Sequence, residues 1–238
     1  SLFGDVIRGV FLDQERLFIG GNNSLLGPIQ ADFGTMTAAD VRINGTLSSG
    51  LNFGHSLPKG KIDYDPRIFL GALGIVTKQV NVLAELTALF HWYKKIRIAF
   101  VAQTPEQKFL YESGLRMVET NYQERLSQLK RFMNAVDNSH SLIANSRKVS
   151  KKEITEQKHL LECWPYIQNK LAAPVDFELP VPETLTNNIK KQQSEGKAAY
   201  TKLIQNLSQE GKQAGKKWLK SISENVWNIF AAEIKKEK

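Results

Sequence analysis

The chain has 238 residues, of which 42% are hydrophobic, so it can bury a sizeable core and does not have the composition of a disordered protein. Its formal net charge of +8 at pH 7 would suit nucleic acid, an anionic membrane or an acidic protein as a partner. A lone cysteine, Cys163, excludes an internal disulfide framework, and with only four histidines it argues against a structural zinc site. The cysteine usage fits a reducing compartment, and we expect a cytoplasmic protein that binds no metal.

Residues 1–57 are predicted to form short strands joined by turns, because Gly, Asn and Ser clusters alternate with Val, Ile, Phe and Thr. Every sixth residue forms a series, called here the six-residue series: Phe11, Leu17, Asn23, Ile29, Thr35, Val41, Leu47 and Phe53. Most of its members are apolar, and the residue two positions earlier is usually small. A step of six predicts a triangular β-solenoid in which each strand supplies one inward side chain. The alternative is an ordinary antiparallel sheet with coincidental spacing.

The next stretch, residues 58–76, is punctuated by Pro58, Gly60 and Pro66 and is predicted to be an irregular joint. Residues 77–172 form a helical region, because apolar residues recur there every three or four positions. The sequence Thr-Pro-Glu-Gln at 104–107 predicts a helix start, and so does the capping box that begins at Ser150. Between these two helices, polar residues 137–149 predict a loop.

Helix periodicity continues to the end of the chain, with two interruptions. Pro165 falls inside the helix that follows Ser150, and we expect a kink or a break there. Residues 173–183 are rich in proline and are predicted to form an extended, semi-rigid strap. Residues 184–238 are predicted to be a basic amphipathic helical segment.

This last segment carries most of the excess positive charge. A solvated lysine-rich surface is one interpretation of it, and contact with an anionic membrane through Trp218, Trp227 and Phe230 is another. Packing of these aromatic side chains on the preceding helices is preferred. Nucleic-acid binding is disfavoured because the charges are mostly lysines spread along the helix without a stacking motif.

The six-residue series resembles the hexapeptide-repeat family in its left-handed parallel β-helix form, over the first quarter of the chain. The stretches that carry the resemblance are Leu17–Asn22, Leu25–Ile29 and Ala38–Leu47, whereas Phe33 and Leu51 stand where the family favours small residues. The resemblance implies acyltransferases or the C-terminal modules of sugar nucleotidyltransferases, many of them trimers and many using a histidine as general base. His55 is the histidine in or beside the repeat, so it is the catalytic candidate, with a structural role as the alternative.

A second candidate site combines aromatic and basic residues. His91, Trp92, Lys94 and Lys95 could bind a nucleotide or a phosphate, although their place in an apolar helix also fits core packing. The pair His159 and Cys163 lacks a third catalytic partner at a recognisable spacing. The sequence Asp63-Tyr64-Asp65 is a possible metal site, but it is also a common sequence in loops.

Taken together, the sequence predicts an α+β protein with a short β-solenoid-like N-terminal region and a larger α-helical region. The functional prediction is the C-terminal, assembly-forming portion of a hexapeptide-type sugar-nucleotide-related transferase, acting in acyl or nucleotidyl transfer as a homo-oligomer such as a trimer. The alternatives are a non-catalytic scaffold that binds partner proteins through its helices, and peripheral membrane binding by residues 184–238. The sequence indicates no particular cofactor.

Overall fold

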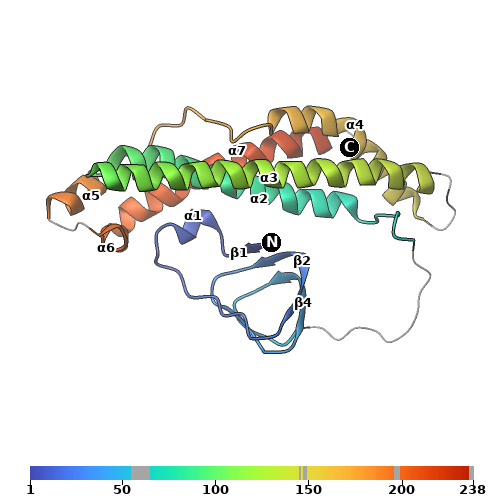
Figure 1. Ribbon diagram of the computed structural model, residues 1–238, viewed down its shortest axis with the longest axis horizontal. Coiled ribbons are helices and arrows are strands. Elements are labelled where there is room, and N and C mark those ends of the chain that lie inside the picture. Colours follow the sequence, from blue (N-terminus) through green and yellow to red (C-terminus); the bar gives the residue numbers. More distant parts are fainter. Residues whose placement is uncertain (55–64, 145, 147–148, 196–198, 236–238) are drawn as a thin grey trace.

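The computed structural model describes residues 1–54, 65–144, 146, 149–195 and 199–235. A long bundle of helices lies beside a small region of strands, and the N-terminus lies between the two (Figure 1). The predicted α+β class is therefore confirmed.

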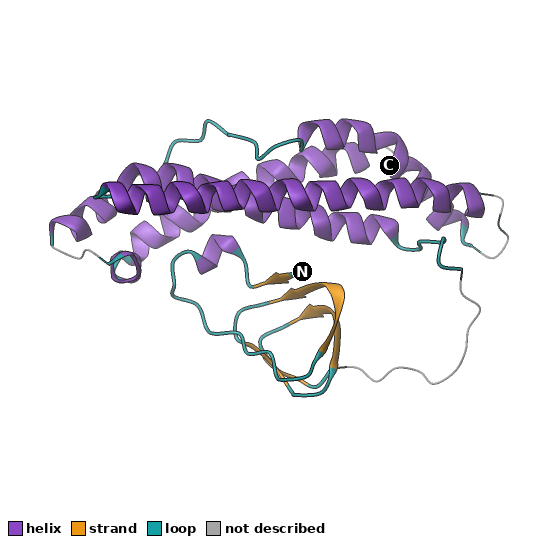
Figure 2. Ribbon diagram, in the orientation of Figure 1, coloured by secondary structure: helices purple, strands orange, loops and turns teal. Residues whose placement is uncertain are grey.

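The strands of the small region pair in parallel. Sheet order is β1-β2-β4 and β3-β5, with the bounds β1 Leu2–Phe3, β2 Ser24–Ala31, β3 Thr35–Thr37, β4 Arg42–Leu47 and β5 Gly50–Asn52. Ser24 faces Arg42 and Phe18 faces Met36, so each of these partners lies 18 residues further along the chain. The alternative of an antiparallel sheet is wrong for these strands, because every recorded pair is parallel. In Figure 2 the strands lie close together on one side of the bundle.

Most members of the six-residue series point into the strand region. Ile29 and Leu47 are buried with Ala31 and Ile43, and Leu17 and Val41 pack against this cluster. The two polar members are accommodated by hydrogen bonds. The side-chain amide of Asn23 donates to Thr37 Oγ1 at 2.8 Å, and its carbonyl oxygen accepts from the Val41 N–H at 2.8 Å. The hydroxyl of Thr35 donates to the Ser48 carbonyl at 3.1 Å.

The first and last members of the six-residue series do not point into the strand region, as the β-solenoid prediction requires. Phe11 is buried among the helices rather than among the strands, because the short helix α1 (Val6–Gly9) carries the chain out of the strand region. Phe53 is 72% exposed.

The helical region begins with α2 and ends with α7. The bounds are α2 Ala72–Trp92, the π-helix η1 Tyr93–Val101 that continues it, α3 Pro105–Ile143, α4 Lys151–Lys170, α5 Glu183–Ser194, α6 Tyr200–Gln205 and α7 Gln209–Ile234. Both predicted helix starts are confirmed. Thr104 Oγ1 accepts from the Gln107 N–H at 3.3 Å, and Ser150 Oγ accepts from the Glu153 N–H at 3.2 Å. These bonds satisfy N–H groups that a helix cannot pair internally.

Two local predictions were wrong, and a third is narrowed. Helix α2 begins at Ala72, before the predicted start at residue 77, because Gly71 adopts a left-handed backbone (φ 70°) that lets the chain turn into the helix. Helix α3 continues to Ile143 through residues predicted to be a loop, and there the buried Ser139 Oγ accepts from the Phe69 N–H at 2.9 Å. Of the kink or break predicted at Pro165, the break is excluded, because α4 runs through this residue from Lys151 to Lys170.

Two hydrophobic clusters hold the bundle together. One joins α2, α3, α4 and the end of α7, and the other joins η1, α5, α6 and the first half of α7 with Phe11. Residues 174–182, between α4 and α5, form neither helix nor strand, in keeping with the predicted strap. By length and composition Ala72–Val101 could cross a membrane, and half of its most apolar window is buried inside the protein.

Candidate functional site

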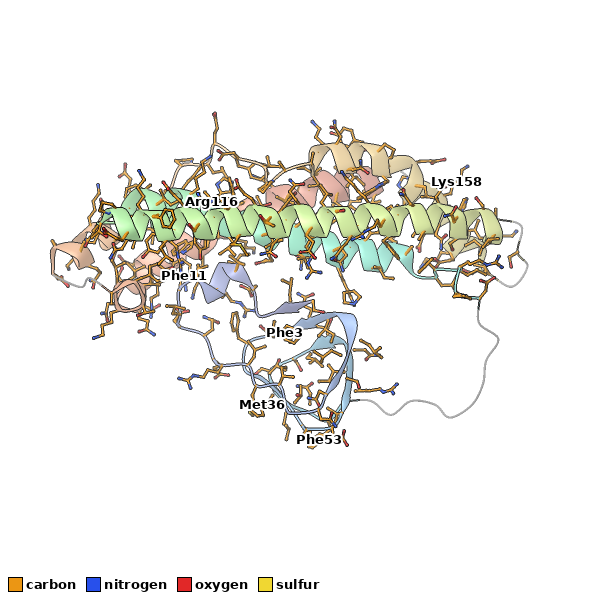
Figure 3. All side chains as sticks on the ribbon, in the orientation of Figure 1. Phe3, Phe11, Met36, Phe53, Arg116 and Lys158 are labelled. Carbon is orange, nitrogen blue, oxygen red and sulfur yellow. The ribbon has the colours of Figure 1, made fainter. Side chains whose placement is uncertain are left out.

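The strand region meets the bundle through residues 5–13, a junction called here the seam. Phe11 has 0% exposure, and its ring packs edge-on against Trp92 with ring centroids 5.2 Å apart. The side chain is held so closely that a Cβ added to Gly215 on α7 would lie 2.5 Å from the Phe11 ring. The Asp13 carboxylate accepts from Lys216 Nζ on the same helix at 3.0 Å. The seam therefore ties the start of the chain to its last helix, and Figure 3 shows Phe11 beside the helices.

A cleft of about 480 Å³ opens along the seam, within the range of small-molecule sites. Its lining comes from α1 and the residue before it, from β2, and from one face each of α2 and α7. The lining residues are Asp5, Ile7, Arg8, Gln30, Asn81, Glu85, Lys220, Ser223, Glu224 and Trp227. Because four elements contribute, the cleft exists only when the strand region is docked on the bundle.

Glu85 is the unusual side chain of this cleft. It lies on the apolar helix α2, is only 5% exposed, and accepts the Val6 N–H at Oε2 over 2.7 Å. Burial raises the pKa of its carboxyl group from 4.5 to about 7; the nearby Asp5 carboxylate raises it further, whereas the backbone N–H groups of Val6 and Ile7 and the charge of Arg8 act in the opposite direction. Both protonation states of Glu85 are therefore populated near neutral pH.

The other charged groups of the cleft already have partners. Arg8 Nε lies 2.6 Å from Asp5, and its terminal nitrogen reaches Asp32 at the edge of an adjoining hollow. Lys220 lies 3.6 Å from Glu224, one turn along α7. Chemically, Glu85 can exchange a proton near pH 7, as a general acid or base does, or serve as the buried cap that fixes α1.

The residues predicted as a nucleotide or phosphate site lie elsewhere, against the strap. His91 and Trp92 are fully buried, and His91 Nε2 lies 3.0 Å from the Val175 carbonyl oxygen. Lys94 Nζ donates to Asp176 at 2.6 Å, and Lys95 Nζ donates to the Phe177 carbonyl at 2.7 Å. Burial lowers the pKa of His91. The observed contacts hold the strap on the bundle, as the core-packing alternative predicts, and the binding role stays a prediction.

The remaining candidates do not form a site with the cleft. His55, the predicted catalytic residue, and Asp63 lie outside the described residues. Asp65 pairs with Arg67 at 2.7 Å, which lowers its pKa to about 2. Within the described part of the chain, no group of three or more metal-ligating side chains is present.

Sequence reasoning missed Glu85, Asn81 and Trp227 as parts of one site. A usable signal was present at Glu85, an acidic residue in the middle of the most apolar helix, but its neighbours in the cleft come from distant parts of the chain. Comparisons with protein-family models, with curated proteins and with solved structures found no match.

Proposed function

We propose that this chain is the assembly-forming portion of a hexapeptide-type, sugar-nucleotide-related transferase, in which strands β1 to β5 form a short β-helix. The offset between paired strands carries the proposal: Ser24 with Arg42 and Phe18 with Met36 are each separated by three steps of six. The offset shortens to 16 residues at the end of β2, where Gln30 pairs with Thr46, and to 15 between β3 and β5. One turn of three short strands is the repeat of a triangular solenoid, whose turns stack in parallel register. Burial of Ile29 and Leu47 at successive turns supports the same arrangement.

Assembly is supported by apolar side chains that point outward from these turns. Phe18 pairs with Met36, and Met36 pairs with Leu51, so the three lie in register on neighbouring strands. They are 61%, 45% and 54% exposed, respectively. We call this row the apolar ladder. Contiguous exposed apolar surface of this kind marks interaction sites, and we assign the ladder to contact between copies of the chain in a homo-oligomer such as a trimer.

Replacing Met36 with glutamate tests the assembly. The parent chain should sediment at a multiple of its 26.9 kDa mass, and the variant should sediment as the monomer, because a charge placed in a closed apolar contact is costly to desolvate. Sedimentation velocity at several concentrations measures the mass, and circular dichroism checks that the variant stays folded. A parent chain that is monomeric at every concentration would refute the proposed assembly.

A scaffold that binds a partner protein through its helices is the second candidate, and α3 supplies the observation that favours it. Phe109, Leu110 and Met117 on the first turns of this helix are each more than half exposed. Met117→Glu is therefore the matched control for Met36→Glu. If Met117→Glu loses self-association and Met36→Glu keeps it, the contact between copies lies on α3 and not on the apolar ladder.

The catalytic part of the proposal has its own test. An acyl-CoA or a sugar nucleotide should raise the melting temperature of a transferase that binds it, because a ligand that binds the folded state stabilises it. If His55 is the general base, His55→Ala should abolish turnover while leaving this thermal shift in place. A panel of both ligand classes without any shift would argue for the non-catalytic scaffold.

We propose that the protein is cytoplasmic and that α7 does not insert into a membrane. The aromatic side chains that suggested membrane insertion are used in packing, since Trp218 and Phe230 are buried and Trp227 packs against Phe230 with ring centroids 5.5 Å apart. Such packing favours a solvated lysine-rich surface on α7 over insertion into a membrane.

A further inference from the structure

We propose that the seam cleft binds a small organic ammonium ion, with the Glu85 carboxylate as its counter-charge. Within the described residues, Glu85 is a buried carboxylate with no lysine, arginine or histidine nitrogen within 4.0 Å of it, although the protein as a whole is basic. The ionised carboxylate is held by the N–H groups of Val6 and Ile7 and by the more distant charge of Arg8. A bound cation would stabilise it further, because a buried charge without a close counter-charge is costly. This inference does not depend on the proposed assembly or on transferase activity.

The charge balance of the cleft favours a cation over an anion. Arg8 is shared between two aspartates and only partly offsets the charge of Glu85, and Lys220 is paired with Glu224. A phosphate or diphosphate entering the cleft would meet the carboxylates of Asp5, Glu85 and Glu224. An ammonium ion would meet them favourably.

The walls offer the other contacts that an amine needs. Trp227 lines the cleft, and the face of an indole ring attracts a cation. The side chains of Gln30 and Asn81 form no hydrogen bond with the described residues, so their oxygens are free to accept N–H groups, and the Ser223 hydroxyl lines the same wall. The volume suits an amine that carries a carbon skeleton rather than a bare ion.

Binding should depend on pH through Glu85. The charged groups around it are Asp5 and Arg8 at the start of the chain, Lys220 and Glu224 on α7, and Lys78, which precedes Glu85 on α2. Because the pKa of Glu85 lies near 7, its ionised fraction rises about tenfold between pH 6 and pH 8. Alkyl amines stay protonated over this range, so their affinity should rise about tenfold as well.

The experiment is isothermal titration calorimetry of the full chain with putrescine and with tyramine, and with glucose and inorganic phosphate as comparison ligands. We expect the amines to bind with the tenfold pH dependence, and the comparison ligands not to bind. Glu85→Gln keeps the shape of the side chain and should abolish amine binding. Glu162→Gln on α4, which removes an exposed carboxylate paired with Lys158, is the matched control and should bind as the parent does.

Three results would overturn the proposal: no heat with either amine, phosphate or glucose binding in place of the amines, or amine binding that survives Glu85→Gln with its pH dependence intact. If Glu85→Gln does not fold, the pH dependence of the parent chain still decides, because affinity that is flat between pH 6 and pH 8 excludes Glu85 as the counter-charge. Sedimentation of the same samples reports assembly separately, so failure of one proposal leaves the other standing.

Discussion

Replacing Phe11 with alanine is expected to lower the free energy of unfolding by about 3 to 5 kcal/mol, the usual cost of removing a fully buried phenylalanine ring. The ring fills a space bounded by Trp92 and by the closest approach of Gly215, and the helices cannot easily collapse into the cavity left behind. Urea denaturation followed by circular dichroism measures the change.

Phe53→Ala is the matched control for this substitution. Phe53 belongs to the same six-residue series but is 72% exposed, and its loss should change the free energy of unfolding by less than about 0.5 kcal/mol. Equal effects of the two substitutions would show that Phe11 is not buried in the bundle.

Replacing Glu85 with glutamine is expected to change how stability depends on pH. A carboxyl group whose pKa is raised from 4.5 to about 7 on folding favours folding when protonated, and it opposes folding progressively as the pH rises through that interval. The parent chain should therefore lose about 3 kcal/mol between pH 4 and pH 8 relative to Glu85→Gln, as 2.5 units of pKa imply. At pH 8 the variant should be the more stable protein.

Urea unfolding of both chains at pH 4, 6 and 8 measures this difference, and other titrating groups cancel because both chains share them. Glu162→Gln, an exposed carboxylate on α4, should follow the parent curve at every pH. Parallel curves for the parent and Glu85→Gln would contradict the raised pKa.

Local signals in the sequence predicted much of the helical region. The caps at Thr104 and Ser150 form the expected bonds, and the apolar residues that recur every three or four positions along α3, from Val118 to Val136, are buried. These predictions succeed because a cap or a stripe depends on residues a few positions apart. The polar residues after Asp137 misled the prediction, since Ser139 gains a hydrogen bond from Phe69, 70 residues away.

The sequence predicted which side chains of the strand region are buried, except at the ends of the six-residue series. The step of six identifies Ile29, Thr35 and Leu47 as buried, because strands repeat locally. The same step places Phe11 among the strands, where the structure has it among the helices. Nothing near Phe11 in sequence reveals this, because its partners Trp92 and Gly215 are distant. The cleft escaped prediction for the same reason: its walls come from residues near both ends of the chain.

The seam also sets an order of events during synthesis on the ribosome. Asp13 bonds to Lys216, which is 203 residues later, and Phe11 contacts the same helix. Phe11 can pack on Trp92, and the Val6 N–H can bond to Glu85, as soon as α2 has been made. The contacts of Phe11 with Gly215 and of Asp13 with Lys216 form only after α7 has been made. Such long-range closure is slow and leaves apolar surface open to aggregation in the meantime. The docking of the strand region is thus completed only when α7 joins it, long after the strands themselves have been made.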